Sequence, residues 1–502
     1  MRHALLGLSE NPALPADLVD RLVAAADAEL AELLSCRSDL DHAQVVALAR
    51  FDSAAVRLVR DGRLTTDDID PAARPQVALA LLEQHSGRVE WARLLATDPL
   101  EEHRERLAAC AGLPEDVIGT LLSDSSMRVV AELALVASAE VVAELSEHPH
   151  AEVRRALAAN AAAPPAALAA LLTGEGLPPA RSCSICDVEE IPFVHHPNCA
   201  RPGCTLPPGA ACTGAHESTV HAIQQMALRN PATPVEAAMG FLDHPSMLLR
   251  QELAARTDLP SHAYARLAED SVPWVRATLA ENPGIGRGLI RTLAGDAGHD
   301  VQRRLAHRPD LPLEILPQLA ETTRIGPTVL PRIAVATPAE VEQLAASSNP
   351  TVRMLLAQRR DLPHPIRDIL ARDPDAKVAK SIASHPGLSE QQLRTMVTRY
   401  GAQVIAGVAA NPDATPALLE SLARFRPPVR KAYREIARHG NATSTALLAC
   451  LTDHRSRPLA ARHSALPQSV IAGLLRDDDR QVVAAAAANP SLPYECMAGL
   501  IP

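Results

Sequence analysis

Aromatic side chains are nearly absent from this chain, since phenylalanine, tryptophan and tyrosine together make up 2% of its 502 residues. The core must therefore be aliphatic, and the alanine-rich stripes predict closely spaced helices. Proteins that bind single-stranded nucleic acid stack bases on aromatic rings, so this function is disfavoured. Lysine is also rare, with only Lys377, Lys380 and Lys431, which we interpret as a bias in base composition.

Long apolar runs are missing as well. No stretch approaches the roughly 18 apolar residues of a membrane-spanning helix, and the N-terminal MRHALLGLSENP is too short an apolar run for a signal peptide. We therefore expect no membrane partner and, by default, a cytoplasmic location. Walker, G-x-S-x-G and H-E-x-x-H motifs are absent too, so we expect a protein that is not an enzyme.

The charge is unevenly distributed along the chain. Residues 1–182 carry 16 arginines and 28 acidic residues, a net charge of −12, whereas residues 217–502 carry 32 basic and 28 acidic residues, a net charge of +4. The net charge of −10 for the whole chain is unlike the strongly basic footprint of a nucleic-acid binder. Nucleic-acid binding through the C-terminal half is kept as an alternative, because that half could accept an acidic partner.

What the sequence does contain is a repeated unit, clearest in LPSHAYARLAEDSVPWVRATLAENP at residues 259–283. One apolar stripe with helical spacing ends at Asp270, and a second ends at Asn282-Pro283. The residue before a proline is pushed out of the helical region, so Asn-Pro closes the unit.

The unit recurs about 18 times, at steps that are mostly 24 to 26 residues long. Its openings fall at Pro15, Asp41, Thr66, Glu90, Pro114, Ala139, Pro165, Pro234, Pro260, Gly286, Pro312, Pro338, Pro363, Ser389, Pro416, Ser444, Pro467 and Pro493. A fixed period of this length indicates a solenoid whose units stack on their neighbours. We predict an all-α solenoid with an N-terminal array (residues 1–182), an insertion (183–216) and a C-terminal array (217–502).

The pattern L-x-x-L-A-x-D followed by V-R-x-x-L-A-x-N-P resembles the leucine-rich repeat variant family over nearly the whole chain outside residues 174–218. The resemblance implies a right-handed α-solenoid of alternating α and short 3₁₀-like helices, with HEAT and armadillo repeats as structural relatives. Members of this family can carry a cysteine-bound iron–sulfur module. The cysteines of this chain lie inside the array and do not match that module position by position.

The insertion is rich in cysteine, histidine, proline and glycine, and it interrupts one repeat between its two helices. The candidate metal ligands are Cys183, Cys186, Cys199, Cys204, Cys212, His195, His196 and His216, of which the first four are the preferred set. A Cys-x2-Cys pair can share one metal ion, and a second pair a dozen residues later can complete a tetrahedron. The histidines favour zinc over a 4Fe–4S cluster held by four thiolates. A linker without metal is the third interpretation.

The arginine of the second stripe recurs at Arg154, Arg250, Arg276, Arg353 and Arg430. We expect each to pair with an acidic residue of a turn between helices, such as Asp243 or Asp270, in preference to forming a row of phosphate contacts.

The sequence therefore favours a non-enzymatic repeat scaffold for protein–protein interaction with a structural metal site, and an iron–sulfur redox or metal sensor is the alternative. Neither end of the chain has the polar composition of a capping repeat. We therefore expect self-association through uncapped ends, and the alternative is that the terminal helices fold over the last repeat. The residues that would be uncovered are Leu5, Leu6 and Leu8 at one end and Tyr494, Met497, Leu500 and Ile501 at the other.

Overall fold

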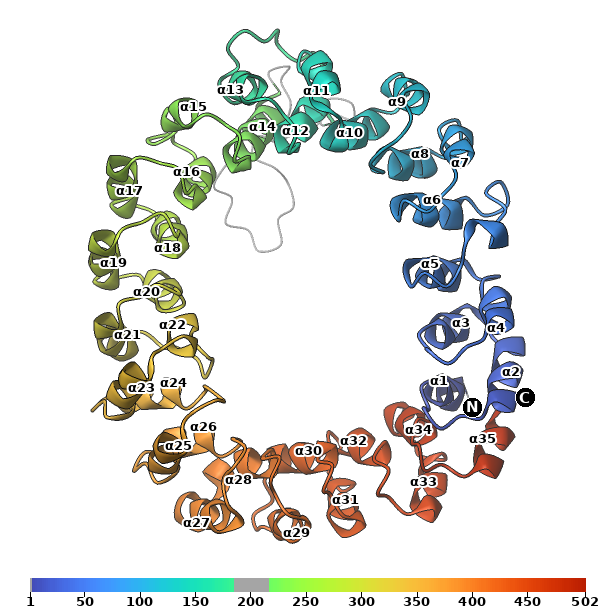
Figure 1. The fold of residues 1–502 in the computed structure, drawn as a ribbon, viewed down its shortest axis with the longest axis vertical. Coiled ribbons are helices and arrows are strands. Elements are labelled where there is room, and N and C mark those ends of the chain that lie inside the picture. Colours follow the sequence, from blue (N-terminus) through green and yellow to red (C-terminus); the bar gives the residue numbers. More distant parts are fainter. Residues whose placement is uncertain (1, 185–215) are drawn as a thin grey trace. The chain divides into compact units, whose positions relative to one another are not determined.

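The computed structural model describes residues 2–184 and 216–502, and every regular element in these ranges is a helix (Figure 1). The only strand-like pairing in the described part is one isolated bridge between His150 and Ser182. The predicted all-α solenoid is thus confirmed. No helix of the described residues has both the length and the apolar character needed to cross a membrane.

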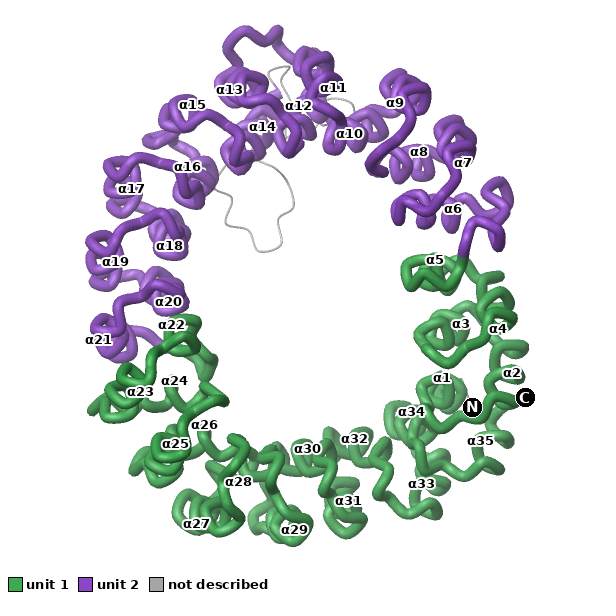
Figure 2. Tube along the Cα trace, in the orientation of Figure 1, with its two compact units in different colours: residues 1–64, 325–502 green, residues 65–324 purple. Residues whose placement is uncertain are grey.

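The helices divide into two compact units, one formed by residues 1–64 and 325–502 (unit 1) and one by residues 65–324 (unit 2) (Figure 2). Both boundaries fall where the repeat pattern is irregular, at the acidic stretch 66–70 and at TTRIGPTVLPRIAVAT (322–337). The domain boundaries expected at the insertion stay a prediction.

Each repeat consists of a first and a second helix, and every predicted opening lies within two residues of the N-terminus of a first helix. In unit 1 the first helices are α2 (Ala16–Ala24), α4 (His42–Leu48), α23 (Pro338–Ala345), α25 (His364–Ala371), α27 (Glu390–Tyr400), α29 (Pro416–Ala423), α31 (Ser444–Cys450), α33 (Gln468–Leu474) and α35 (Tyr494–Leu500). Its second helices are α1 (Arg2–Ser9), α3 (Ala28–Ser35), α5 (Asp52–Arg60), α22 (Pro331–Ala334), α24 (Pro350–Leu356), α26 (Ala376–Ile382), α28 (Ala402–Ala409), α30 (Arg430–Arg438), α32 (Arg457–Ala461) and α34 (Arg480–Ala487).

Unit 2 follows the same alternation. Its first helices are η1 (Thr66–Asp68), α7 (Val89–Leu95), α9 (Glu115–Leu122), α11 (Ala139–Leu145), α13 (Pro165–Thr173), α15 (Val235–Met239), α17 (Ser261–Ala268), α19 (Arg287–Ala294) and the pair η2 (Leu313–Ile315) and α21 (Leu316–Thr322). Its second helices are α6 (Pro75–Glu83), α8 (Glu101–Ala108), α10 (Met127–Val136), α12 (Ala151–Ala159), α14 (Glu217–Arg229), α16 (Met247–Ala255), α18 (Pro273–Glu281) and α20 (His299–Ala306).

Within each unit the second helices form one layer and the first helices another (Figure 1). Neighbouring second helices contact one another much more extensively than neighbouring first helices do. Small residues explain this difference, because Ala277 and Ala280 of α18, for example, are fully buried and let the next second helix approach closely. The stacking is therefore tighter on one side, and each unit curves with its second helices on the concave side.

An arginine on the second helix joins each of several repeats to the next. In four repeats its Nε lies 2.6 Å from an aspartate oxygen 20 residues ahead, in the turn of the following repeat, and Nη1 donates to a carbonyl of its own turn. These pairs are Arg104–Asp124, Arg250–Asp270, Arg276–Asp296 and Arg353–Asp373. Burial alone would raise the pKa of Asp296, but the guanidinium of Arg276 more than offsets it, so this pKa lies below its usual range. The expected pairing with turn aspartates is confirmed for Arg250, Arg276 and Arg353, whereas Arg430 is 79% exposed and approaches Asp453 only at 3.8 Å.

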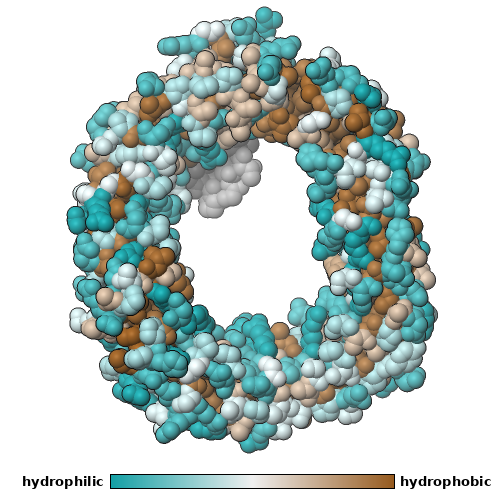
Figure 3. Space-filling view, in the orientation of Figure 1, coloured by the Kyte–Doolittle hydropathy of each residue, from teal (hydrophilic) through white to brown (hydrophobic). Residues whose placement is uncertain are grey.

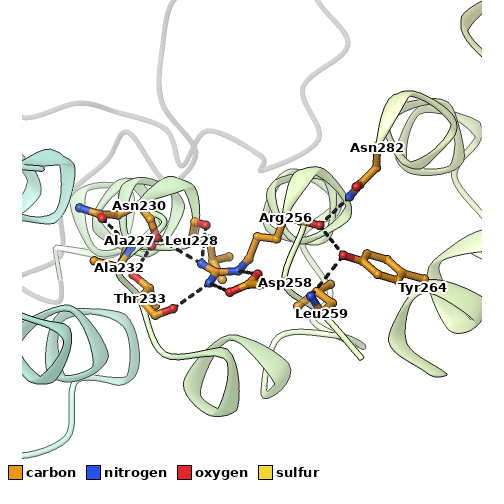
Figure 4. A network of polar contacts seen from close by, with 10 residues as sticks. All are labelled: Ala227, Leu228, Asn230, Ala232, Thr233, Arg256, Asp258, Leu259, Tyr264 and Asn282. Carbon is orange, nitrogen blue, oxygen red and sulfur yellow. Dashed lines mark hydrogen bonds and ion pairs between the residues drawn. The ribbon is translucent and has the colours of Figure 1, made fainter. Parts of the chain in front are cut away.

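A second recurring device is a buried polar side chain at the end of the second helix, which we call the ladder residue (Figure 4). Asn282 donates hydrogen bonds to the carbonyls of Ala254 and Arg256, and Arg256 in turn donates to those of Leu228 and Asn230. These carbonyls end the preceding second helix and have no partner within it. The ladder residue therefore supplies hydrogen-bond donors to the carbonyls at the end of the second helix in the preceding repeat. The same role falls to Asn11, Arg37, Arg63, Asn160, Asn230, Arg308, Arg359, His385, Asn411, His439, His463 and Asn489.

The two ends of the chain join in unit 1 as if they were neighbouring repeats. The last helix, α35, is a first helix without a following partner in the sequence, and α1 is a second helix without a preceding one. Helix α1 stacks on α34, and the side chain of Asn11 donates to the carbonyls of Ala487 (2.9 Å) and Asn489 (2.8 Å). This is the same ladder contact that Asn489 makes with Ala461 and His463.

Helices α35 and α1 thus form one composite repeat from opposite ends of the sequence. Its first helix also contacts the next first helix, α2, because the Tyr494 hydroxyl binds Asp17 at 2.7 Å and Arg21 donates to the Ile501 carbonyl at 2.9 Å. Of the seven apolar residues expected to be uncovered, Leu8, Met497 and Ile501 are buried, Leu5, Leu6 and Leu500 are half-buried, and Tyr494 is 46% exposed. The prediction of uncapped ends is therefore wrong, because α1 and α34 stack on each other, whereas self-association stays a prediction.

Candidate functional site

The insertion leaves and re-enters the array within one repeat, as the sequence predicts. It begins after α13, at Gly174 with a left-handed backbone (φ 78°), and the chain returns at His216, the N-cap of α14. Helices α12 and α14 are consecutive second helices that stack directly on each other. The stacking of the repeats therefore continues across the insertion.

Arg154 reveals how the repeat adapts to the insertion. The position 20 residues after Arg154 is Gly174, whereas the four paired arginines have an aspartate at this distance. The guanidinium of Arg154 instead donates to the carbonyls of His148 (2.7 Å), Pro178 (2.7 Å) and Glu147 (3.2 Å). Burial lowers the pKa of Arg154, and the nearby carboxylate of Glu147 offsets this effect only in part. The expected ion pair is thus wrong for Arg154, which holds the start of the insertion through its backbone.

The chain then runs beside the N-terminus of α12. The amide of Ala151 donates to the carbonyl of Ser182 at 2.9 Å, and the amide of Arg181 donates to that of Pro149 at 2.8 Å. The Ser184 hydroxyl binds Glu152 at 2.6 Å, and Arg155 pairs with the same carboxylate at 2.6 Å. Burial would raise the pKa of Glu152, but these two hydrogen bonds lower it overall. The base of the insertion is therefore an ordered part of the array.

Two of the eight predicted metal ligands lie in this ordered base. Cys183 is completely buried, and His216 is 4% exposed with a left-handed backbone (φ 52°) that is uncommon for a residue other than glycine. The remaining six, Cys186, Cys199, Cys204, Cys212, His195 and His196, lie outside the described residues. Among the described residues, no three histidine, cysteine or acidic side chains gather as a metal site would require. The ligand set stays a prediction.

Sequence reasoning missed His150 at the same base. Its imidazole is 4% exposed, and Nδ1 accepts a hydrogen bond from the amide of Glu152 at 3.2 Å, so it caps α12. The backbone of His150 itself forms the bridge with Ser182 that anchors the insertion. The local pattern His-Pro-His gave no sign of this, because the anchoring segment is more than 30 residues away in the chain.

A second candidate site lies on the exposed face of the second helices in unit 2. Trp274 of α18 is 45% exposed, whereas the other tryptophan, Trp91, is buried in the core. The guanidinium carbon of Arg304, on α20, lies 4.6 Å from the centre of the Trp274 ring, and its Nη1 binds Glu281 at 2.7 Å. Such stacking of a cation on an aromatic ring holds both side chains in place. The pair therefore presents an ordered, flat, amphipathic surface to solvent.

Comparisons with known proteins add little to this geometry. No family model and no curated protein matches the chain. A solved structure of the Pds5–Scc1 complex, described for its implications for cohesin function, matches over 96% of this chain and 68% of its own, with 12% sequence identity and a TM-score of 0.15. A TM-score this low carries no argument about function. The α-solenoid is established by the helices themselves, and the leucine-rich repeat variant family stays an interpretation.

Proposed function

We propose that this chain is a non-enzymatic repeat scaffold that binds another protein through the exposed face of its second helices. The observation that carries the proposal is the ordered pair of Trp274 and Arg304 on that face. Tryptophan and arginine supply most of the binding energy at protein interfaces, and each usually fills the centre of the contact. The core has no need of this indole, which is half exposed.

Replacing Trp274 by alanine should remove the centre of this contact. Hot-spot truncations cost about 2 kcal/mol or more, which is roughly a thirtyfold loss of affinity. We expect Trp274→Ala to recover at least tenfold less of its protein partners than the wild-type chain in quantitative affinity purification. The matched control is Ile369→Ala, which removes an equally exposed apolar side chain from the first helix α25. Equal recovery by both variants and the wild type would contradict the proposal.

The leucine-rich repeat variant family is the family that we propose for the chain. The regular period, the Asn-Pro stops and the second-stripe arginine support it, because each recurs in the same place in successive repeats. The ladder gives the asparagine a physical role, since Asn282 donates to two carbonyls of the preceding repeat.

We also propose that the insertion binds one structural zinc ion through four of its eight cysteine and histidine candidates. The spacing of the ligands supports zinc, and a 4Fe–4S cluster with a sensing role is the alternative. The buried Cys183 on an ordered base is consistent with a ligand that ties the insertion to α12.

Replacing Cys183 by serine tests the metal directly. We expect protein purified without oxygen to contain about one zinc ion per chain, and Cys183→Ser to lose most of it, because metal binding supplies the folding energy of such segments. Hydrogen exchange should then rise in residues 178–184 but not in the distant C-terminal repeats. Cys36→Ser is the control, since Cys36 is exposed just after the end of α3 and this variant should keep the metal. Iron with absorption near 400 nm would favour the cluster, and metal-free wild type would refute both.

A further inference from the structure

The three lysines of the chain lie on one surface of unit 1. Lys377 and Lys380 belong to α26 and Lys431 to α30, and all three are exposed. The ion pairs between repeats use arginine, whose planar fork of donors binds a carboxylate with two hydrogen bonds, and the ladder residues are asparagine, arginine and histidine. Lysine is a flexible point charge. The three lysines lie on one surface and take no part in the hydrogen bonds and ion pairs between the described repeats, so their position favours a role in binding a partner.

These lysines occupy fixed positions in the repeat. In α30, Lys431, Arg434 and Arg438 lie eight, five and one residues before the ladder residue His439, and this spacing puts them on one face of the helix. Lys377 and Lys380 lie eight and five residues before His385, and Arg462 lies one before His463. We call this set of six the basic face. Figure 3 shows hydrophilic residues over this part of the unit.

Most of these charges are not neutralised in the described structure. Lys377, Lys380, Lys431 and Arg434 form no ion pair with any described residue within 4.0 Å. Arg438 approaches Glu435 only at 3.8 Å, with its own side chain 56% exposed. Arg462 pairs with Glu10 at 2.7 Å, but both side chains are about half exposed, where such a pair contributes little. The face thus holds two groups of positive charge, one on α26 and one on α30 and Arg462, and the neutral Gln403, Ala406 and Ala410 at the same positions of α28 lie between them.

The basic face is bounded on both sides. At the same three repeat positions α24 carries Thr351, Met354 and Gln358, and α34 carries Gln481, Ala484 and Ala488, which are all neutral. Farther along, α3 presents Glu29 and Glu32. Four second helices from α26 to α32, spaced by about 10 Å, span roughly 30 Å. An extended peptide of about nine residues covers this length.

We propose that the basic face binds an extended acidic segment, rich in aspartate and glutamate, of a partner protein. This inference rests on the proposed role as a protein-binding scaffold and names the chemistry of one partner. Guanidinium and ammonium groups bind carboxylates by charge-assisted hydrogen bonds. A nucleic acid fits the face less well, because a long strand would run on to Glu29 and Glu32 and would find no exposed aromatic ring here for stacking.

Fluorescence anisotropy with synthetic probes tests the proposal on the full chain. The probe is a fluorescein-labelled peptide of about 12 residues that alternates glutamate and serine, compared with a lysine–serine peptide and a DNA duplex of about 12 base pairs. We expect the wild-type chain to bind the acidic peptide in low salt more tightly than either other probe, and the affinity to fall as salt rises. The triple variant Lys377→Glu, Lys380→Glu, Lys431→Glu should bind it at least tenfold more weakly.

The control variant changes the net charge equally at a distance from the face. Arg372→Glu, Arg424→Glu and Arg476→Glu replace exposed arginines at the ends of first helices in the same unit, and this variant should keep most of the affinity. Tighter binding of the duplex than of the peptide, no binding of the peptide, or equal losses in both triple variants would overturn the proposal. Trp274→Ala should leave peptide affinity unchanged, so its failure in affinity purification separately tests the scaffold role.

Discussion

Gly7→Ala is expected to destabilise unit 1, although alanine is the better helix former. A Cβ atom at Gly7 would lie 2.0 Å from the carbonyl oxygen of Ala484 and 2.7 Å from its Cα. These are backbone atoms of α34, which cannot rotate away as a side chain would, so α1 must move out of the composite repeat. Overpacking of this kind costs about 1–3 kcal/mol. Urea unfolding should show the loss, and hydrogen exchange should locate it in α1 and α34.

The same substitution elsewhere in the composite repeat provides the control. Gly499 lies in α35, and no atom lies within 4 Å of the position that its Cβ would take. Gly499→Ala should therefore raise the free energy of unfolding by up to about 1 kcal/mol through helix propensity alone. The two glycine-to-alanine substitutions in the composite repeat should thus change the free energy of unfolding in opposite directions. If both stabilise the chain, α1 is not held against α34.

His385→Asn is expected to remove a large acid sensitivity of unit 1. The ring is fully buried, Nε2 lies 2.8 Å from the carbonyl oxygen of Ala357 and donates to it, and Nδ1 has no hydrogen-bond partner in the described structure. Burial, with smaller contributions from Arg360 and Arg367, lowers the pKa of His385 from 6.5 to about 4. Protonation would place a charge and an unpaired N–H in the core, so the neutral ring is the folded form.

The sign of the effect follows from these two pKa values. Above pH 6.5 neither the folded nor the unfolded chain binds this proton, so the buried neutral ring of His385 makes its full contribution to the free energy of unfolding. Between pH 6.5 and 4 only the unfolded chain binds it, which costs about 1.4 kcal/mol per pH unit, or roughly 3 kcal/mol in all. Asparagine fills the same ladder position at Asn411 and Asn489, so His385→Asn should fold normally.

The measurement is the unfolding midpoint in urea between pH 7 and pH 4.5. The wild type should lose stability steadily as the pH falls, whereas His385→Asn should lose distinctly less over the same interval, because only the other groups with lowered pKa values, such as His221 and His244, still contribute. His307→Asn is the control, because His307 is exposed at the end of α20 and its replacement should leave the wild-type pH dependence in place. Parallel curves for wild type and His385→Asn would show that this histidine is not the source.

The starts of the helices could be predicted from the sequence because their signals are local. A proline such as Pro260 or Pro363 fixes the backbone at the start of a first helix, and Asn282-Pro283 stops a second helix whatever lies beyond. The sequence also predicts that Arg276 pairs with an aspartate of a turn, since an aspartate recurs in many of the turns between helices. Its true partner, Asp296, belongs to the following repeat and not to its own.

The ladder could not be predicted, because its acceptors are backbone carbonyls. Asn282 reaches back 28 residues to the carbonyl of Ala254, and no side chain there marks the contact. Closure of the ends was missed for a related reason. The apolar residues of α1 and α35 predict that another helix packs on them, but no local pattern in the sequence identifies α34 as the helix that packs on α1.

The candidate site was predictable only in part. The interrupted repeat and the cluster of cysteines located the insertion at 183–216, and these bounds stay a prediction. The described chain leaves α13 at Gly174, before the first of the cysteines. The base contacts of Cys183 and Ser184 with α12 depend on the fold of the preceding repeat. The basic face was overlooked because its lysines are too far apart in sequence to form a cluster, and only the stacking of α26 and α30 in one layer relates them.

The composite repeat also has a consequence for the order of events during synthesis. Helix α1 leaves the ribosome before the helices that cover it, because its ladder partner Asn489 lies 478 residues after Asn11 in the chain. At about 5–20 residues per second, translation keeps these partners apart for roughly half a minute to a minute and a half. Loop closure over such a separation is also among the slowest folding steps. Until α34 emerges, Leu8 and its neighbours on α1 lack the helix that buries them in the folded chain. A nascent chain that stalls before this point would expose these residues to chaperones and proteases.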